Sequence, residues 1–131
     1  MTESHARILV LDDESLIRIM ARELLQALGY ESDLAAEGGE AVSLYRQSLD
    51  NGFPYCAVLV DLTICNGMGG LEAAMKIREM DSDAKLVVSS GFSEKGIVER
   101  YRDYGFSAAM PKPYRLVDLR NVLDVLCRKG S

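Results

Sequence analysis

The chain has 131 residues, which is typical of a single domain, and its 48% hydrophobic and 27% charged residues are typical of a globular protein. This balance excludes a disordered tail, a collagen and a disulfide mini-protein. Twenty acidic against fifteen basic residues give a net charge of -5, which argues against direct binding of nucleic acid. We therefore expect one domain over residues 1–131, with an ordered core of about 7–127.

No membrane-spanning or secretory segment is visible in the sequence. The longest apolar runs are far too short to span a bilayer, and the polar residues before Ile8 do not resemble a signal peptide. Cys56, Cys65 and Cys127 are widely spaced and form no CxxC pair, so we expect reduced thiols, a cytoplasmic location and no membrane contact. The single histidine, His5, cannot supply a zinc site or a histidine-based catalytic triad.

Short apolar runs alternate with segments of helical spacing along the chain. Five runs indicate strands: Ile8–Leu11, Ser32–Ala35, Ala57–Val60, Leu86–Val88 and Ala108–Met110. Five segments with apolar residues at helical spacing indicate helices: Ile17–Leu28, Val42–Leu49, Leu71–Ile77, Ile97–Tyr104 and Leu116–Leu126. The alternation predicts an α/β domain, with a doubly wound parallel sheet of five strands in the flavodoxin-like order 2-1-3-4-5 and five covering helices.

Polar side chains stand at the carboxyl ends of four of the five predicted strands. These are Asp12, Asp13 and Glu14 after the first strand, Asp61 after the third, Ser89 and Ser90 after the fourth, and Lys112 after the fifth. A single acid in such a place is usually a helix cap, and Asp13 could be one. However, the carboxyl ends of parallel strands meet at one edge of the sheet, where doubly wound folds bind their ligands. The set therefore indicates a functional site.

The chemistry of this set is specific. Two carboxylates roughly 4 Å apart repel by about 4 kcal/mol at an effective dielectric of about 20. Several of them with one lysine attract a hard cation, and oxygen ligands favour Mg²⁺, with Mn²⁺ as a substitute. A carboxylate beside Mg²⁺ can attack a phosphoryl group whose oxygens the metal and the ammonium neutralise. The residues therefore favour phosphoryl transfer onto an aspartate.

Four motifs stand in order along the chain: Ile-Leu-Val-Leu-Asp-Asp-Glu at 8–14, Asp61 after an apolar strand, Ser-Gly-Phe at 90–92 and Lys-Pro-Tyr at 112–114. Together they resemble the receiver domain of two-component response regulators, and the resemblance runs from Arg7 to about Cys127. The segments Asp-Leu-Thr-Ile at 61–64 and Gly-Met-Gly-Gly at 67–70 are similar to receivers attached to hybrid sensor histidine kinases. The chain could then be the cytoplasmic part of a membrane-bound hybrid kinase.

The resemblance implies a phosphoacceptor and a metal site. Asp61 would take a phosphoryl group from a phosphohistidine of a sensor kinase or phosphotransfer protein, and would also bind Mg²⁺. Asp13 would bind the metal directly, Asp12 chiefly through water, and the backbone carbonyl of Thr63 would be a further ligand. Such a domain is a signalling switch rather than a conventional enzyme, although it catalyses its own phosphorylation and dephosphorylation. We expect a monomer or weak dimer.

The resemblance also implies the groups that surround the phosphoryl group. Lys112 would hold a phosphoryl oxygen, and its bond to Pro113 is typically cis in the family, which directs the lysine inward. Ser90 would be the hydroxyl that moves toward the phosphoryl group. Ser89 is a rival for that role, but the motif and its spacing from Lys112 favour Ser90. Thr63 and Phe92 would flank the water that hydrolyses the phosphoryl group.

Two positions depart from the family pattern. Cys65 stands where a proline is usual, in a loop that is one residue longer than in most receivers, and is either a tolerated variant or a redox-sensitive thiol. Ala109 stands where many receivers have an aromatic residue that rotates on activation. Without that ring, we expect changes on phosphorylation to remain mostly in the loops around the site.

Other functions of this fold fit less well. An FMN-binding protein needs a phosphate loop rich in serine and threonine after the first strand, where Asp12 and Asp13 would repel the phosphate. A phosphatase with an aspartyl nucleophile usually has Asp-x-Asp, whereas Leu62 and Thr63 follow Asp61. The remaining alternative is a degenerate receiver that acts as an unphosphorylated protein-binding module.

Overall fold

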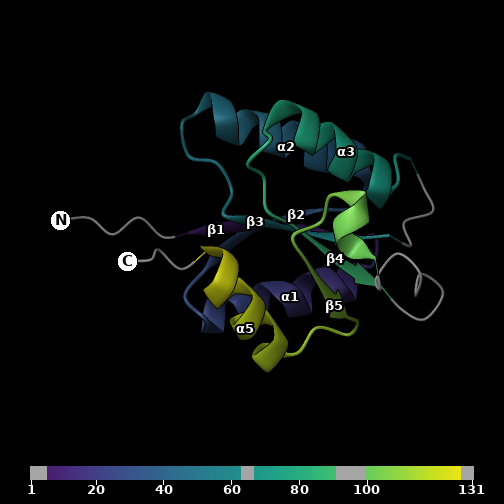
Figure 1. Ribbon diagram of the computed structural model, residues 1–131. Helices are drawn as coiled ribbons and strands as arrows, with labels where there is room; N and C mark the ends of the chain where they lie inside the picture. Colours follow the sequence, from purple (N-terminus) through teal and green to yellow (C-terminus); the bar gives the residue numbers. More distant parts are fainter. Residues whose placement is uncertain (1–5, 63–66, 91–99, 128–131) are drawn as a thin grey trace.

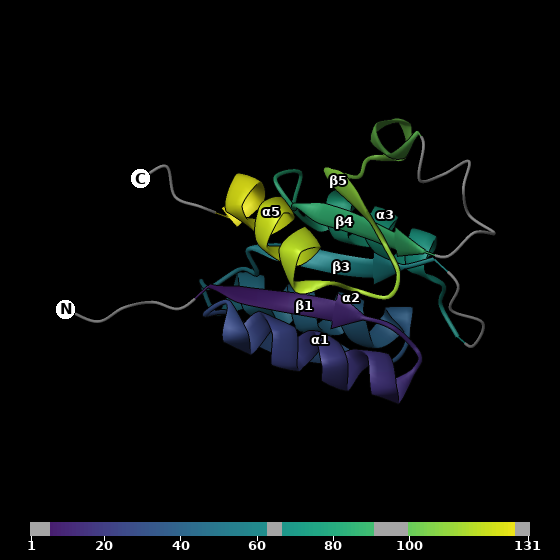
Figure 2. The same ribbon diagram turned by 90° about the horizontal axis from the view of Figure 1, so that it is seen from below.

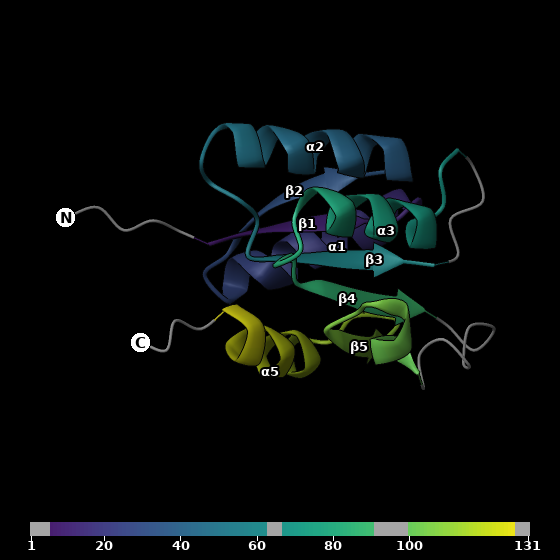
Figure 3. The same cartoon turned by 45° about the horizontal axis from the view of Figure 1, so that its top comes forward.

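The computed structural model describes residues 6–62, 67–90 and 100–127. Its centre is a parallel sheet with the expected strand order, β2-β1-β3-β4-β5. The strands are β1 (Arg7–Leu11), β2 (Glu31–Ala35), β3 (Ala57–Asp61), β4 (Leu86–Ser90) and β5 (Ala108–Pro111). All five point in the same direction, so their carboxyl ends form one edge of the sheet (Figures 2 and 3).

Helices cover both faces of the sheet, which has α2 and α3 on one side and α1 and α5 on the other (Figure 1). Their bounds are α1 (Ser15–Ala27), α2 (Gly38–Asp50), α3 (Gly70–Met80) and α5 (Leu116–Cys127). Gly29 follows α1 with a φ of 92°, a left-handed conformation that suits glycine and explains why the helix stops there. No helix of the described residues is long and apolar enough to cross a membrane.

The two faces of the sheet carry separate hydrophobic cores, because successive side chains of a strand point to opposite faces. In β1, Leu9 and Leu11 belong to the core under α2 and α3, whereas Ile8 and Val10 belong to the core under α1 and α5. All residues of β3 are buried. The central strands are therefore held rigidly on both sides, which fixes the positions of the residues at their carboxyl ends.

The fourth predicted helix differs from the prediction. The described residues contain four α-helices, and in place of a fourth one in chain order they show a 3-10 helix, η2 (Tyr101–Tyr104), which Gly105 ends with a φ of 88°. Tyr101 packs against the core, but Tyr104 is 44% exposed. The predicted apolar stripe is thus only partly buried, and Ile97 at its start lies outside the described residues. The expectation of five α-helices is wrong for the described chain.

The expectation of three reduced thiols is also wrong. A disulfide joins Cys56, which precedes β3, to Cys127 at the end of α5, with 5.6 Å between the two Cα atoms. The two cysteines are separated by 71 positions, so only the packing of α5 against the sheet brings them together. Cys65 lies outside the described residues.

Candidate functional site

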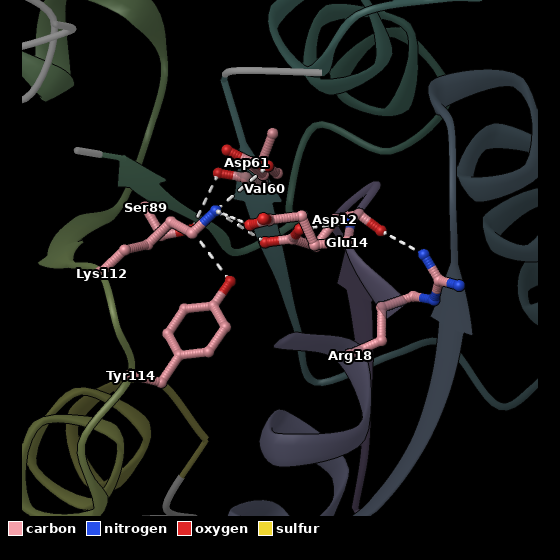
Figure 4. A network of polar contacts seen from close by, with 8 residues as sticks. All are labelled: Asp12, Glu14, Arg18, Val60, Asp61, Ser89, Lys112 and Tyr114. Atoms are coloured by element: carbon pink, nitrogen blue, oxygen red, sulfur yellow. Dashed lines mark hydrogen bonds and ion pairs between the residues drawn. The ribbon is translucent and has the colours of Figure 1, made fainter. Parts of the chain in front are cut away.

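Three side chains from different strands meet at the carboxyl edge of the sheet (Figure 4). Asp12 follows β1, Asp61 ends β3 and Lys112 follows β5. The ammonium nitrogen Nζ of Lys112 lies 3.0 Å from Oδ2 of Asp12 and 3.3 Å from Oδ2 of Asp61. Because β1, β3 and β4 are adjacent and β5 is next to β4, the sheet order alone brings these residues of distant sequence together.

The cluster is deeply buried. Asp12 and Asp61 are fully buried, and the side chain of Lys112 is 13% exposed. Burial raises the pKa of the Asp12 carboxyl, and the charge of Asp61 raises it further, against the opposing effects of the Glu14 N–H and of Lys112. Burial by itself would lower the pKa of the Lys112 ammonium, but Asp12 and Asp61 outweigh it and raise that pKa. The raised pKa values of Asp12 and Lys112 both mean that the surroundings of these groups favour a bound proton, and thus additional positive charge.

The carboxylates are arranged so that a cation could bind. One oxygen each of Asp12, Asp13 and Asp61 lies within 4.8 Å of the others. Asp13 is partly exposed, so the cluster opens toward solvent on its side. Among the residues that the structure describes, only carboxylates converge here, with no nitrogen or sulfur ligand, and such a set fits a hard cation such as Mg²⁺ better than zinc.

The start of α1 supports Asp12 in a way that the sequence did not predict. Oδ1 of Asp12 accepts a hydrogen bond from the backbone N–H of Glu14 at 2.9 Å, and Arg18 donates to the backbone carbonyl of Asp12 at 2.8 Å. Glu14, not Asp13, occupies the N-cap position of α1, and its side chain makes no capping hydrogen bond. The Glu14 carboxylate also lies 3.8 Å from the Lys112 ammonium, although its side chain is 64% exposed.

A close backbone contact holds β3 against α3. Gly70, the first residue of α3, is buried, and a Cβ atom there would clash with the backbone carbonyl oxygen of Asp61. Only glycine allows this approach. Gly70, the last residue of the Gly-Met-Gly-Gly segment, therefore allows the start of α3 to lie against the end of the strand that carries Asp61.

The Ser89 hydroxyl, the alternative to Ser90 in the sequence, has a hydrogen-bonding partner of its own. Ser89 is fully buried, and its hydroxyl forms a hydrogen bond of 2.9 Å with the hydroxyl of Tyr114. The backbone of Ser90 ends β4 opposite Pro111, and its side chain is outside the described structure. Thr63 and Phe92 also lie outside the described residues. The peptide bond between Lys112 and Pro113 is cis, as the resemblance implies.

Comparisons with known proteins agree with this geometry. The family model of the response regulator receiver domain matches residues 8–124. The chain is 24% identical over 117 residues to sporulation initiation phosphotransferase F of Bacillus subtilis, which covers 89% of this chain and 90% of that protein. It is 35% identical over 120 residues to the transcriptional regulatory protein PdtaR of Mycobacterium tuberculosis, which covers 91% of this chain but only 55% of PdtaR.

Solved structures show the same fold. The receiver domain of the sensor histidine kinase PA1611 from Pseudomonas aeruginosa, described with a magnesium ion coordinated in the active site cleft, superimposes with a TM-score of 0.80 at 23% identity, covering 96% of this chain and 100% of that one. CheY in the CheX-CheY-BeF3-Mg²⁺ complex from Borrelia burgdorferi also gives a TM-score of 0.80, at 24% identity, covering 92% and 88% of the two chains.

Proposed function

The chain belongs to the response regulator receiver domain family, and from this premise we propose that it takes a phosphoryl group from a phosphohistidine onto Asp61 as a signalling switch. The observation that carries the proposal is the position of Asp61. Its carboxylate is fully buried at the end of the central strand β3, 3.3 Å from the Lys112 ammonium and within the acidic cluster. A carboxylate in this setting can act as a nucleophile whose product is stabilised by positive charge.

The proposed reaction forms one bond and breaks one. A carboxylate oxygen of Asp61 attacks the phosphorus of the phosphohistidine, the phosphorus–nitrogen bond breaks, and the imidazole leaves with the electron pair. Lys112 would hold a phosphoryl oxygen, and Ser90 would donate a hydrogen bond to another. Ser89 is already bonded to Tyr114, which supports the choice of Ser90. The resulting acyl phosphate would be hydrolysed by water that passes Thr63 and Phe92.

In this proposal the domain depends on Mg²⁺, for which Mn²⁺ can substitute. Asp13, Asp61 and the backbone carbonyl of Thr63 would bind the ion directly, and Asp12 chiefly through water. When bound, the ion would neutralise negative charge on the phosphoryl oxygens. The excess of carboxylates over ammonium groups at the carboxyl edge supports this dependence, since Lys112 alone cannot balance Asp12, Asp13 and Asp61.

The phosphoryl donor in this proposal is a sensor histidine kinase or a histidine phosphotransfer domain. We place the domain in the cytoplasm, as a single receiver of residues 1–131 that acts as a monomer or weak dimer without binding nucleic acid or membrane. The net charge of -5 supports the exclusion of nucleic acid. Disulfides are rare in the cytosol, so the Cys56–Cys127 pair would face a reducing thiol pool there.

Transfer from a phosphorylated histidine kinase tests the proposal. The kinase is labelled with radioactive phosphate, freed from ATP and mixed with the chain, with and without Mg²⁺. We expect the label to move to the chain only when Mg²⁺ is present, and to be stable in acid but labile in alkali, as an acyl phosphate is. Binding of the kinase without transfer of the label would instead favour the unphosphorylated protein-binding module.

A further inference from the structure

Two buried hydroxyl groups, those of Tyr114 and Ser89, belong to the network around Asp12, Asp61 and Lys112 that Figure 4 shows. The Tyr114 hydroxyl and the Ser89 hydroxyl are 2.9 Å apart, and the two residues are 3% and 0% exposed. Burial raises the pKa of the Tyr114 phenol, so the group stays protonated and can donate a hydrogen bond. This pair is not among the site residues that the family motif supplies for metal binding or phosphoryl transfer.

The pair links the loop that carries Lys112 to the strand that carries Asp61. The Ser89 hydroxyl lies 3.4 Å from the backbone carbonyl oxygen of Val60, to which it can donate. Tyr114 then donates to Ser89, which gives a chain of contacts from Tyr114 across β4 to the residue immediately before Asp61. At the other end of this series of contacts, Tyr114 is separated from Lys112 in the sequence only by Pro113.

The Tyr114 ring is well placed to transmit such a constraint. It packs in the core under α1 and α5, together with Leu59 of β3 and Met110 of β5. A ring fixed in a close-packed core has little freedom, so its hydroxyl is held at a defined position.

The other buried tyrosine hydroxyls of the described chain have a different kind of partner. Tyr45 donates to Asp81 at 2.7 Å and Tyr55 donates to Asp33 at 2.6 Å, and both pairs lie away from the Lys112 cluster. Those hydroxyls satisfy carboxylates, whereas the Tyr114 hydroxyl is bonded to a neutral serine within the site. The three tyrosines therefore provide a natural comparison between hydroxyls at and away from the site.

We propose that Tyr114 and Ser89 are positioning residues that hold the Lys112 ammonium between Asp12 and Asp61, a role that rests on the proposed phosphoryl transfer to Asp61. The bridge fixes the distance between the Lys112 loop and β3. Without this bridge, the flexible four-carbon side chain of Lys112 can place the ammonium over a wider range of positions. The ammonium is then less often between Asp12 and Asp61 when a phosphoryl donor binds. Misplacing a reacting group by about 1 Å can slow a reaction by about 100-fold. A Lys112 ammonium that is less well held still reaches the correct position part of the time, so we expect the rate of phosphorylation to fall by less than this.

The test compares Tyr114→Phe with Tyr45→Phe, each of which removes one buried hydroxyl. With acetyl phosphate as donor and saturating Mg²⁺, we expect Tyr114→Phe to slow phosphorylation by about three- to tenfold and Tyr45→Phe to leave it unchanged. The apparent affinity for Mg²⁺ should be the same in both variants, because neither hydroxyl belongs to the carboxylate cluster. Ser89→Ala should slow phosphorylation as Tyr114→Phe does, and the double variant should be no slower than the slower single variant.

A second readout is independent of phosphorylation. The ammonium resonance of Lys112, assigned with a Lys112→Arg variant, can be followed by 15N NMR in the unphosphorylated protein. We expect Tyr114→Phe and Ser89→Ala to move it toward the shifts of exposed lysines, and Tyr45→Phe to leave it in place. If the wild-type chain accepts no phosphoryl group, the proposed function fails, but a shift of this resonance still supports the positioning role. An unchanged resonance in Tyr114→Phe and Ser89→Ala overturns that role, as does a wild-type rate of phosphorylation in both.

Discussion

The charged side chains at the two ends of the sheet differ in burial and in partners: those at the amino end are partly exposed, whereas Asp12 and Asp61 at the carboxyl end are buried. At the amino end, Arg7 and Asp33 form an ion pair of 3.0 Å, the Tyr55 hydroxyl donates to the same Asp33 carboxylate, and the Arg7 guanidinium stacks 4.6 Å from the centre of the Tyr55 ring. Arg7 and Asp33 are therefore each other's partner of opposite charge. This amino-end network is complete by itself and is typical of a structural contact.

At the carboxyl end, negative charge exceeds positive charge. Asp12 and Asp61 share the single ammonium of Lys112, and Glu14 lies near it as well. The guanidinium of Arg18 donates to the backbone carbonyl of Asp12. A cluster left with excess charge in a buried place costs stability, which is expected where the missing positive charge comes from a ligand. The charges of Arg7 and Asp33 therefore stabilise the fold, whereas the excess negative charge beside Lys112 indicates a binding site.

The largest expected effect comes from removing one carboxylate at each end. Asp61→Asn should reduce phosphorylation by more than about 100-fold, because the nucleophile is lost, whereas Asp33→Asn should leave it unchanged. Urea unfolding should show the opposite order. Asp33→Asn should lower the free energy of unfolding by about 1 kcal/mol, because an ion pair and a hydrogen bond are weakened. Asp61→Asn should raise it, because Lys112 then faces one buried carboxylate instead of two. Destabilisation by Asp61→Asn would contradict the idea of excess charge.

The next effect concerns the backbone that positions Asp61. Gly70→Ala should slow phosphorylation by about tenfold or more, because its Cβ clashes with the Asp61 carbonyl and moves the end of β3. Gly29→Ala is the matched control: its φ of 92° strains alanine, but nothing lies within 4 Å of the new Cβ. Its free energy of unfolding should fall by about 1 kcal/mol with no change in phosphorylation. Equal rates in the two variants would show that the end of β3 tolerates displacement.

A similar but smaller difference is expected for the metal. Asp13→Ala should weaken binding of Mg²⁺ by about tenfold, because a direct ligand is lost. Glu14→Ala removes a neighbouring exposed carboxylate and should change the affinity by less than about twofold. Titration of both variants with Mg²⁺, followed by NMR shifts, measures the two affinities. Equal losses would mean that the acids act only through their summed charge.

The smallest effect at the carboxyl end should come from the disulfide, which lies at the opposite edge. Thiol titration of the unfolded chain should find one reactive cysteine without reductant and all three cysteines of the sequence with it. Reduction should lower the free energy of unfolding by up to about 4 kcal/mol, since the bond closes a long loop. The rate of phosphorylation should not change. Three reactive thiols in the untreated chain would show that the pair is not bonded.

Much of the fold was predictable because it depends on local patterns. The run Ile8–Leu11 is apolar at every position, which is typical of a strand covered on both faces, and Asp12 follows where the strand leaves the core. The gathering of Asp12, Asp61 and Lys112 then followed from the strand order. The prediction of an α-helix over Tyr101–Tyr104 was wrong because it also depended on local spacing alone. The spacing of these tyrosines is helical, but it does not show that Tyr104 is exposed and that the segment forms a 3-10 helix.

Contacts that depend on three-dimensional packing were not predictable. Nothing in the local sequence of Cys56 or Cys127 indicates a partner 71 positions away. Likewise, the bond between Tyr114 and Ser89 depends on where α5 begins and on which face of β4 Ser89 lies. Before the structure, Ser89 could be considered only as a rival to Ser90, because two adjacent serines at a strand end look equivalent in sequence.

The transfer of a phosphoryl group to Asp61 is tested by identifying the residue that carries it. The phosphorylated chain is treated with borohydride, which reduces an aspartyl phosphate to homoserine, and the peptides are sequenced by mass spectrometry. We expect homoserine at position 61, none at positions 12 or 13, and none anywhere in the Asp61→Asn variant. Homoserine at position 12 or 13 of the wild-type chain would contradict the central role of the buried carboxylate at the end of β3.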